Sequence, residues 1–161
     1  MSTKKHLHEK RDITFQEYGA LLGTRAMLAA KALKPDRRNT FINVAPGEHR
    51  FNMCTKGKAS QCGTVSCIGG TMAFLMGKDP TRYVDDYNPR SRVIGTNLFA
   101  RDPRACSVSL IPLFYPTGVG EPPTWTWITP EVAVKAIDNW LRTGKAGWKA
   151  LKKIYGKKSS R

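Results

Sequence analysis

The sequence is poor in acidic residues. Its 161 residues contain 12 Asp and Glu against 27 Lys and Arg, which gives a formal net charge of +15. An imbalance of this size creates a positive potential that a polyanion neutralises with release of counterions. The composition therefore predicts nucleic acid as a partner, and it leaves open whether that partner is DNA or RNA.

Long apolar runs are also missing. The most apolar stretch, Val65 to Met76, is far shorter than the roughly 20 residues that cross a bilayer, so we expect no membrane partner. The basic N-terminus leads into a segment with Gln16, Glu17 and Arg25, and not into a short apolar run with a small-residue cleavage site. These absences predict a cytoplasmic protein, in which the cysteines stay reduced.

The cysteines lack the spacing that is typical of a zinc site. Cys62 and Cys67 are separated by four residues, and Cys54 and Cys106 would complete a tetrahedral set. The usual structural zinc site has two close pairs, and here there is no second pair. Free cysteine is among the most buried residue types. We interpret the cysteines as structural and expect no cofactor, with zinc as the open alternative.

Catalytic motifs are missing as well. The chain has no phosphate-binding glycine loop and no serine elbow of the hydrolase type. His49 lies near Cys54, and Cys67 falls in the first turn of an expected helix, but a cysteine nucleophile needs a base that actually reaches the sulfur. Packing is the simpler role for these cysteines.

Two acidic or histidine-rich segments are the remaining candidates for metal chemistry. His6-Leu7-His8-Glu9 lies in a terminal arm that we expect to be mobile, whereas metal catalysis needs rigidly held ligands. Asp85-Asp86 would suit magnesium in a nuclease, but adjacent carboxylates in a Tyr-Asn-Pro loop are typical of turns. We predict that the protein is not an enzyme, and a metal-dependent nuclease is the alternative of that class.

The hydrophobic content, 40% of residues, suffices for the core of one small domain. Charge divides the chain into a basic N-terminal arm (1–12), a globular core domain (13–147) and a basic C-terminal tail (148–161). The expected fold class is α+β, mainly helical, with a minor antiparallel β-hairpin or sheet.

Three longer helices are expected. The segment Thr14-Phe15-Gln16-Glu17 has the form of a capping box and predicts a helix over 15–33. Thr64 is the expected N-cap of a second helix, whose glycines indicate a central and tightly packed element. The third helix is expected to start at Thr129-Pro130-Glu131 and to stop at Gly144.

Two short strands are expected at 40–44 and 50–54 because of their β-branched and aromatic residues. Pro46-Gly47 between them favours a hairpin. The residues from Lys56 to Ser60 are expected to form a loop, and 78–103 to be irregular.

Basic segments alternate with aromatic residues near the C-terminus. Trp148, Leu151 and Tyr155 would form one face of a short amphipathic turn whose other face carries lysines. The rings would either stack on bases or dock this segment on the core, which is the expected role of Trp148. A loop segment rich in arginine supplies further phosphate-seeking groups. The residues expected to contact nucleic acid are Lys4, Lys5, Arg82, Arg90, Arg92, Arg101, Arg104, Lys149, Lys152, Lys153, Lys157 and Lys158.

The central motif resembles a pattern of small uncharacterised proteins of bacteriophages and bacteria. Phe51-Asn52-Met53 and then Cys62-Gly63-Thr64-Val65-Ser66-Cys67-Ile68-Gly69-Gly70 match its Phe-Asx-Met strand and its Cys-Gly-Thr-x-x-Cys-Ile-x-Gly motif. Leu113-Phe114-Tyr115-Pro116, Thr129-Pro130-Glu131, and Trp140-Leu141 with Thr143-Gly144 and Trp148 extend the resemblance over roughly residues 50 to 150. The resemblance implies a phage or prophage origin, and hence the host cytoplasm, but no established activity.

These observations predict a non-enzymatic nucleic-acid-binding phage accessory protein that acts by phosphate neutralisation. The alternative is a protein-interaction module of a phage, either an inhibitor of a host or defence protein or a virion component. Trp125 and Trp127, on a Pro-rich loop where we expect them to be exposed, would suit such an interface with a host protein.

Overall fold

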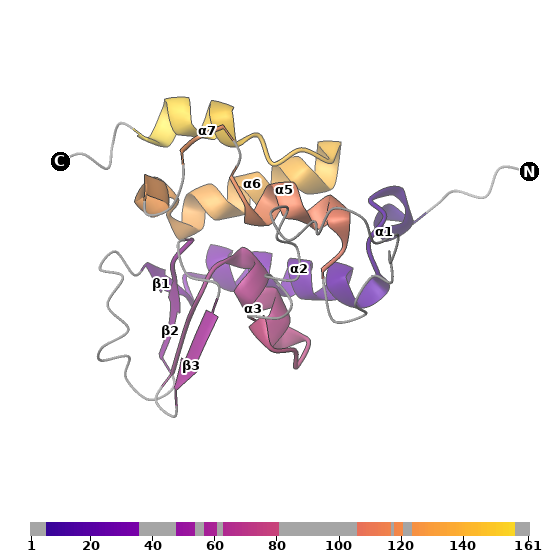
Figure 1. Cartoon of the computed structure of the whole chain (residues 1–161), viewed down its shortest axis with the longest axis horizontal. Helices are drawn as coiled ribbons and strands as arrows, with labels where there is room; N and C mark the ends of the chain where they lie inside the picture. Colours follow the sequence, from indigo (N-terminus) through magenta and orange to yellow (C-terminus); the bar gives the residue numbers. More distant parts are fainter. Residues whose placement is uncertain are drawn as a thin grey trace, which may run out of the picture.

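Three helices form the framework of the fold. The computed structural model describes residues 6–35, 48–53, 57–60, 63–80, 106–116, 118–120 and 124–156. Within them, α2 (Phe15–Ala29) packs against both α3 (Ile68–Leu75) and α6 (Pro130–Thr143). Figure 1 shows α7 (Trp148–Tyr155) on the outside of α6, on the side away from α2.

Shorter elements complete the helical part. They are α1 (Leu7–Lys10), the 3-10 helix η2 (Val108–Leu110), α5 (Ile111–Phe114) and the 3-10 helix η3 (Thr124–Trp127). Their contacts with the longer helices close one hydrophobic core. Its largest fully buried side chains are Trp140, Phe51, Leu21, Leu28, Ile68, Met72, Leu110, Leu113, Ile137 and Val132. The expectation of a mainly helical α+β domain is confirmed.

The capping box at the start of α2 is confirmed. The Thr14 hydroxyl accepts a hydrogen bond from the backbone N–H of Glu17 at 3.1 Å, and the Glu17 carboxylate accepts one from the backbone N–H of Thr14 at 2.9 Å. Each bond satisfies an amide that has no partner within the helix.

The end of α2 comes earlier than the expected Leu33. Lys31 adopts a left-handed conformation with φ 57°, and the backbone N–H of Ala32 donates to the carbonyl of Met27 at 2.9 Å. This is the Schellman arrangement, usually made with glycine at the left-handed position. The apolar spacing continued past Ala29, but it carried no signal for a left-handed lysine.

The sheet is mixed, and its order is β1-β2-β4-β3. Its strands are β1 (Lys34–Pro35), β2 (Glu48–Phe51), β3 (Gly57–Ser60) and β4 (Gly63–Ser66). β2 pairs in parallel with β1 and with β4, and β3 pairs antiparallel with β4. The strand expected at 50–54 begins and ends earlier, because β2 covers Glu48–Phe51 and Asn52 and Met53 are not in a strand. The strand expected at 40–44 lies outside the described residues.

The predicted antiparallel pairing is wrong for β2, because its neighbours on both edges, β1 and β4, are parallel to it. A turn signal such as Pro46-Gly47 favours a local hairpin, but it does not decide which distant strand competes for the same edge. The loop expected from Lys56 to Ser60 is also wrong, since β3 occupies Gly57–Ser60 and forms the one antiparallel pairing described.

The start of the second helix is corrected as well. The expected N-cap Thr64 lies within β4, where it pairs with His49 of β2. The N-cap of α3 is Cys67, whose Sγ accepts a hydrogen bond from the backbone N–H of Gly70 at 3.4 Å. Because Gly69 and Gly70 are buried, the prediction of a central, tightly packed helix is confirmed.

The third helix agrees with the sequence at both ends. Thr129 occupies the N-cap, Pro130 the first helical position, and Gly144 the left-handed C-cap with φ 78°. The Thr129 side chain makes no capping bond. Instead it hydrogen-bonds the exposed carboxylate of Glu131 and lowers the pKa of that group.

The two tryptophans of the Pro-rich loop are buried, so their predicted exposure is wrong. Trp125 and Trp127 are each 5% exposed. Trp125 Nε1 donates to the carbonyl of Gly120 at 2.8 Å, and Trp127 meets Trp148 edge-to-face at 6.5 Å between ring centroids. Burying a large aromatic ring lowers the free energy of the folded state, because apolar surface is removed from water. The two rings of η3 therefore pack into the core.

Candidate nucleic-acid interface

Helix α7 presents one face to the core and the other to solvent. Trp148 and Leu151 are buried, and Trp148 Nε1 donates to the carbonyl of Pro112 at 2.8 Å. Lys149 and Lys153 are exposed on the outer side. The predicted amphipathic turn is therefore confirmed as a helix, and its apolar face docks it on the core.

The lysines of α7 have different surroundings. Lys152 Nζ donates to the carbonyl of Val119 at 2.9 Å, and the stem of Lys149 lies against Gly118. Both lysines thus hold the 118–119 segment to α7. The side chain of Lys153 makes no hydrogen bond or ion pair within the described part of the chain. Its charge is available to a ligand.

A basic residue from the N-terminal segment contacts the C-terminal end of α6. Arg11 donates from Nε and from a terminal nitrogen to the carbonyl of Leu141, at 3.2 and 2.9 Å. It also lies beside Gly144, which ends α6. A cation at a helix C-terminus satisfies the free carbonyls and the negative end of the dipole. Arg11 therefore holds α1 against the C-terminal end of α6.

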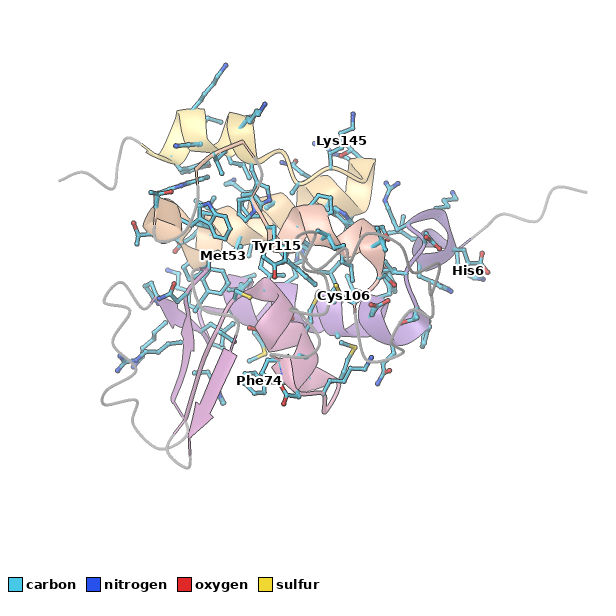
Figure 2. All side chains as sticks on the ribbon, in the orientation of Figure 1. His6, Met53, Phe74, Cys106, Tyr115 and Lys145 are labelled. Atoms are coloured by element: carbon cyan, nitrogen blue, oxygen red, sulfur yellow. The ribbon has the colours of Figure 1, made fainter. Side chains whose placement is uncertain are left out.

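We call five exposed cations, which extend from α1 over the end of α6 and the α6–α7 connection to α7, the basic surface; Lys152, which is bonded to Val119, is not counted. Its members are Lys10, Arg142, Lys145, Lys149 and Lys153. Figure 2 shows nitrogen-tipped side chains projecting from the outer side of α7, and Lys145 near the connection between the two helices.

Little negative charge opposes the basic surface from its own part of the chain. Asp138 is the last acidic residue of the sequence. It forms a bidentate pair with Arg25, with oxygen–nitrogen distances of 2.5 and 3.1 Å. In the segment 139–156, which the structure describes in full, every charged side chain is positive. Surfaces of this kind attract polyanions.

Only some of the predicted contact residues lie in the described part of the chain. Lys149, Lys152 and Lys153 lie on α7, and Lys149 and Lys153 share its outer side. Lys10, Arg142 and Lys145 were not among the predicted contact residues, and the anchoring role of Arg11 was not predicted. The uninterrupted run of positive charge after Asp138 indicates Arg142 and Lys145, whereas nothing local signals a bond between residues 130 positions apart. The other predicted residues fall outside the described ranges: Lys4, Lys5, Arg82, Arg90, Arg92, Arg101, Arg104, Lys157 and Lys158.

The C-terminal rings do not form an open stacking surface. Trp148 is buried, so its docking role is confirmed and base stacking on it is excluded. Tyr155 is half-buried, and Lys135 Nζ lies 6.0 Å from its ring centroid. The cation occupies the approach to this ring, which ties α7 further to α6.

The described cysteines have structural surroundings. Cys67 and Cys106 are not in disulfide bonds, and both are buried. Burial, together with the nearby Cys67 and Cys106, raises the pKa of Tyr115 to about 12. Cys54, Cys62 and the Asp85-Asp86 pair lie outside the described residues. Among those that are described, no group of three or more His, Cys, Asp or Glu side chains is placed to hold a metal ion.

The N-terminal histidine segment, predicted to lie in a mobile arm, has a defined local structure at residues 6–11. Leu7–Lys10 is helical, and the Glu9 carboxylate accepts a hydrogen bond from the backbone N–H of His6 at 2.8 Å. The two histidine rings stack on each other at 5.9 Å between centroids. The segment is held by this local capping and by Arg11.

Comparisons of the chain with protein-family models, with curated proteins and with solved structures return no match. None of the described helices is long and apolar enough to cross a membrane.

Proposed function

We propose that the protein binds nucleic acid through the basic surface and performs no chemistry on it. The proposal depends on one observation: the end of α6 and the outer side of α7 carry exposed positive side chains, and no acidic residue follows Asp138 in the sequence. The fold holds these charges in place, because Trp148 and Leu151 dock α7 and Arg11 docks α1.

The proposed mechanism is phosphate neutralisation. Lysine side chains on an exposed helix face approach phosphates as point charges and release condensed counterions. Contacts of this type fix a protein on the nucleic acid but do not read its sequence. We therefore expect binding with little sequence preference. The resemblance in the central motif supports the further proposal that this is an accessory protein of phage origin.

The alternative of a protein-interaction module loses its main support. That hypothesis depended on an exposed Trp125 and Trp127, and both rings are buried. Within the described residues, the basic surface is the feature that best supports binding to a partner.

A salt titration of the intact protein tests the proposal. Affinity for a duplex oligonucleotide is measured by fluorescence anisotropy between 50 and 300 mM KCl. If the five cations of the basic surface each displace a counterion, the slope of log K against log salt is about −4.5, from about 0.9 per phosphate contact. Binding that does not change with salt, or no binding at low salt, would contradict the proposal.

A further inference from the structure

A cluster of rings lies at the corner between α1 and α2. The ring of His8 stands edge-on to Phe15 at 5.6 Å between centroids and tilted against Tyr18 at 6.2 Å. His6 stacks on His8 with an interplanar angle of 17°. Aromatic and imidazole rings of this kind are the surfaces on which unpaired bases stack.

Phe15 is the exposed member of the cluster. It occupies the first position of α2, and 74% of its surface is accessible to solvent. The core position next to it is filled by Ile13, which is 6% exposed. A single exposed apolar residue is ordinary on a protein surface. Phe15 differs because its ring meets His8 in a T-shaped contact and His8 in turn stacks on His6, so three rings lie together at this corner.

The ring cluster and one cation of the basic surface share helix α1. Lys10, a member of that surface, lies on α1 between His8 and Arg11. Arg11 attaches this helix to the carbonyl of Leu141 in the last turn of α6, and α6 leads into the connection that carries Lys145. Two acidic residues flank Lys10: Glu9, whose carboxylate accepts a hydrogen bond from the backbone of His6, and the exposed Asp12. Helix α1 thus carries both His8 and Lys10, a ring and a cation that one bound strand can contact in succession.

We propose that His6, His8 and Phe15 form a stacking platform for an unpaired base, which makes single-stranded nucleic acid the preferred ligand of the basic surface. This inference rests on the proposed function. Bases of a continuous duplex are stacked on each other and do not reach such a platform, whereas bases of a single strand do. Stacking tolerates all bases because each has a π-face, so this preference concerns strandedness and not sequence.

The test compares Phe15→Ala with the wild type on a single-stranded oligonucleotide and on a blunt duplex of equal length, at one salt concentration. We expect the variant to bind the single strand about 5- to 150-fold more weakly, the range for loss of one stacked base. Duplex affinity and the salt slope stay unchanged, because no charge is removed. Phe15→Trp keeps an aromatic ring, so it should bind the single strand about as well as the wild type does. The fluorescence of its exposed indole should be quenched by the bound strand.

Val108→Ala is the matched control, since Val108 is also an exposed apolar residue, 56% accessible. It should leave both affinities unchanged. Circular dichroism melting verifies that each variant is folded, and His8→Ala is the second variant should Phe15→Ala unfold.

Each remaining outcome is decisive. Equal single-strand binding by Phe15→Ala and the wild type overturns the platform, as does an equal loss on both ligands. A wild type that binds duplex with the expected salt dependence but shows no preference for single strands overturns this inference alone. A wild type that binds neither ligand overturns the proposed function as well.

Discussion

Ser107 holds the buried carboxylate of Glu17 with two hydrogen bonds. Its backbone N–H donates to Oε1 at 2.7 Å and its hydroxyl to Oε2 at 2.5 Å. Thr14 adds a backbone and a hydroxyl donor from the other side. Glu17 is 3% exposed, so its charge is retained in the core by these donors. One carboxylate thus caps α2 and joins it to the segment that precedes η2.

The stability of the protein should decrease in acid because of Glu17. Burial by itself raises the pKa of Glu17, but the hydrogen bonds from Ser107 and Thr14 outweigh it and lower the pKa below its ordinary value of 4.5. A lowered folded-state pKa contributes stability above the unfolded-state pKa, and this contribution is lost as the pH falls through the folded-state value. We expect the free energy of unfolding, measured in urea, to fall below about pH 5.

Two variants isolate this contribution. Ser107→Ala should lower the free energy of unfolding at pH 7 by about 1.5–3 kcal/mol, the range for a hydrogen bond to a charged group. Glu17→Gln should also destabilise the protein at pH 7, and the difference from wild type should shrink towards pH 3. A constant difference across this range would show that the carboxylate does not carry the effect.

Arg11 should control the order of α1. In Arg11→Met the stem is kept and both bonds to the Leu141 carbonyl are lost. A net loss of about 1 kcal/mol corresponds to about fivefold faster amide exchange in α1. The amides to follow by hydrogen exchange are those of Lys10, Arg11 and Ile13, which are bonded within this region. Amides in the middle of α6 should keep their protection, and faster exchange there would indicate general destabilisation.

Neutralising a lysine that contacts a phosphate should reduce the slope of log K against log salt. Lys145→Gln and Lys153→Gln each remove one charge of the basic surface, and neither side chain holds a structural bond in the described chain. We expect each to reduce the magnitude of the salt slope by about 0.9 for duplex DNA.

Lys31→Gln is the matched control for these lysines. Lys31 is also exposed, but it lies at the end of α2 and close enough to Glu131 to lower its pKa. Its neutralisation should leave the slope unchanged. The same reduction for all three variants would mean that binding depends on net charge and not on the basic surface.

Lys31→Gly should stabilise the protein. Lys31 has φ 57°, a left-handed conformation that costs an L-residue roughly 1–2 kcal/mol and costs glycine little. We expect a gain of about 1 kcal/mol, which raises Tm by about 2–4 °C for a chain of this size. Lys31→Ala removes the same charge but keeps the Cβ atom, so it should give no gain. A lower Tm for the glycine variant would contradict the strain argument.

The predictions that were confirmed depend on neighbouring residues. The Thr14–Glu17 box and the proline and glycine that bound α6 make their bonds within a few positions, so these residues alone specify them. The predictions that were wrong depend on distant partners. Thr64 suits a helix start, but pairing of β4 with β2 and β3 places it in a strand. The Pro-rich setting of Trp127 suggested exposure, and contact with Trp148 buried it.

The amino-acid sequence alone determined the positive charge, the helical content and the helix ends that use capping residues and glycine. Each of these depends on composition or on hydrogen bonds between near neighbours. Folding in three dimensions decided that Ser107 meets Glu17, that Arg11 meets Leu141 and that α7 turns its lysines outward. These contacts join residues 90 and 130 positions apart. Their formation depends on how the whole core excludes water, and no local stretch contains that information.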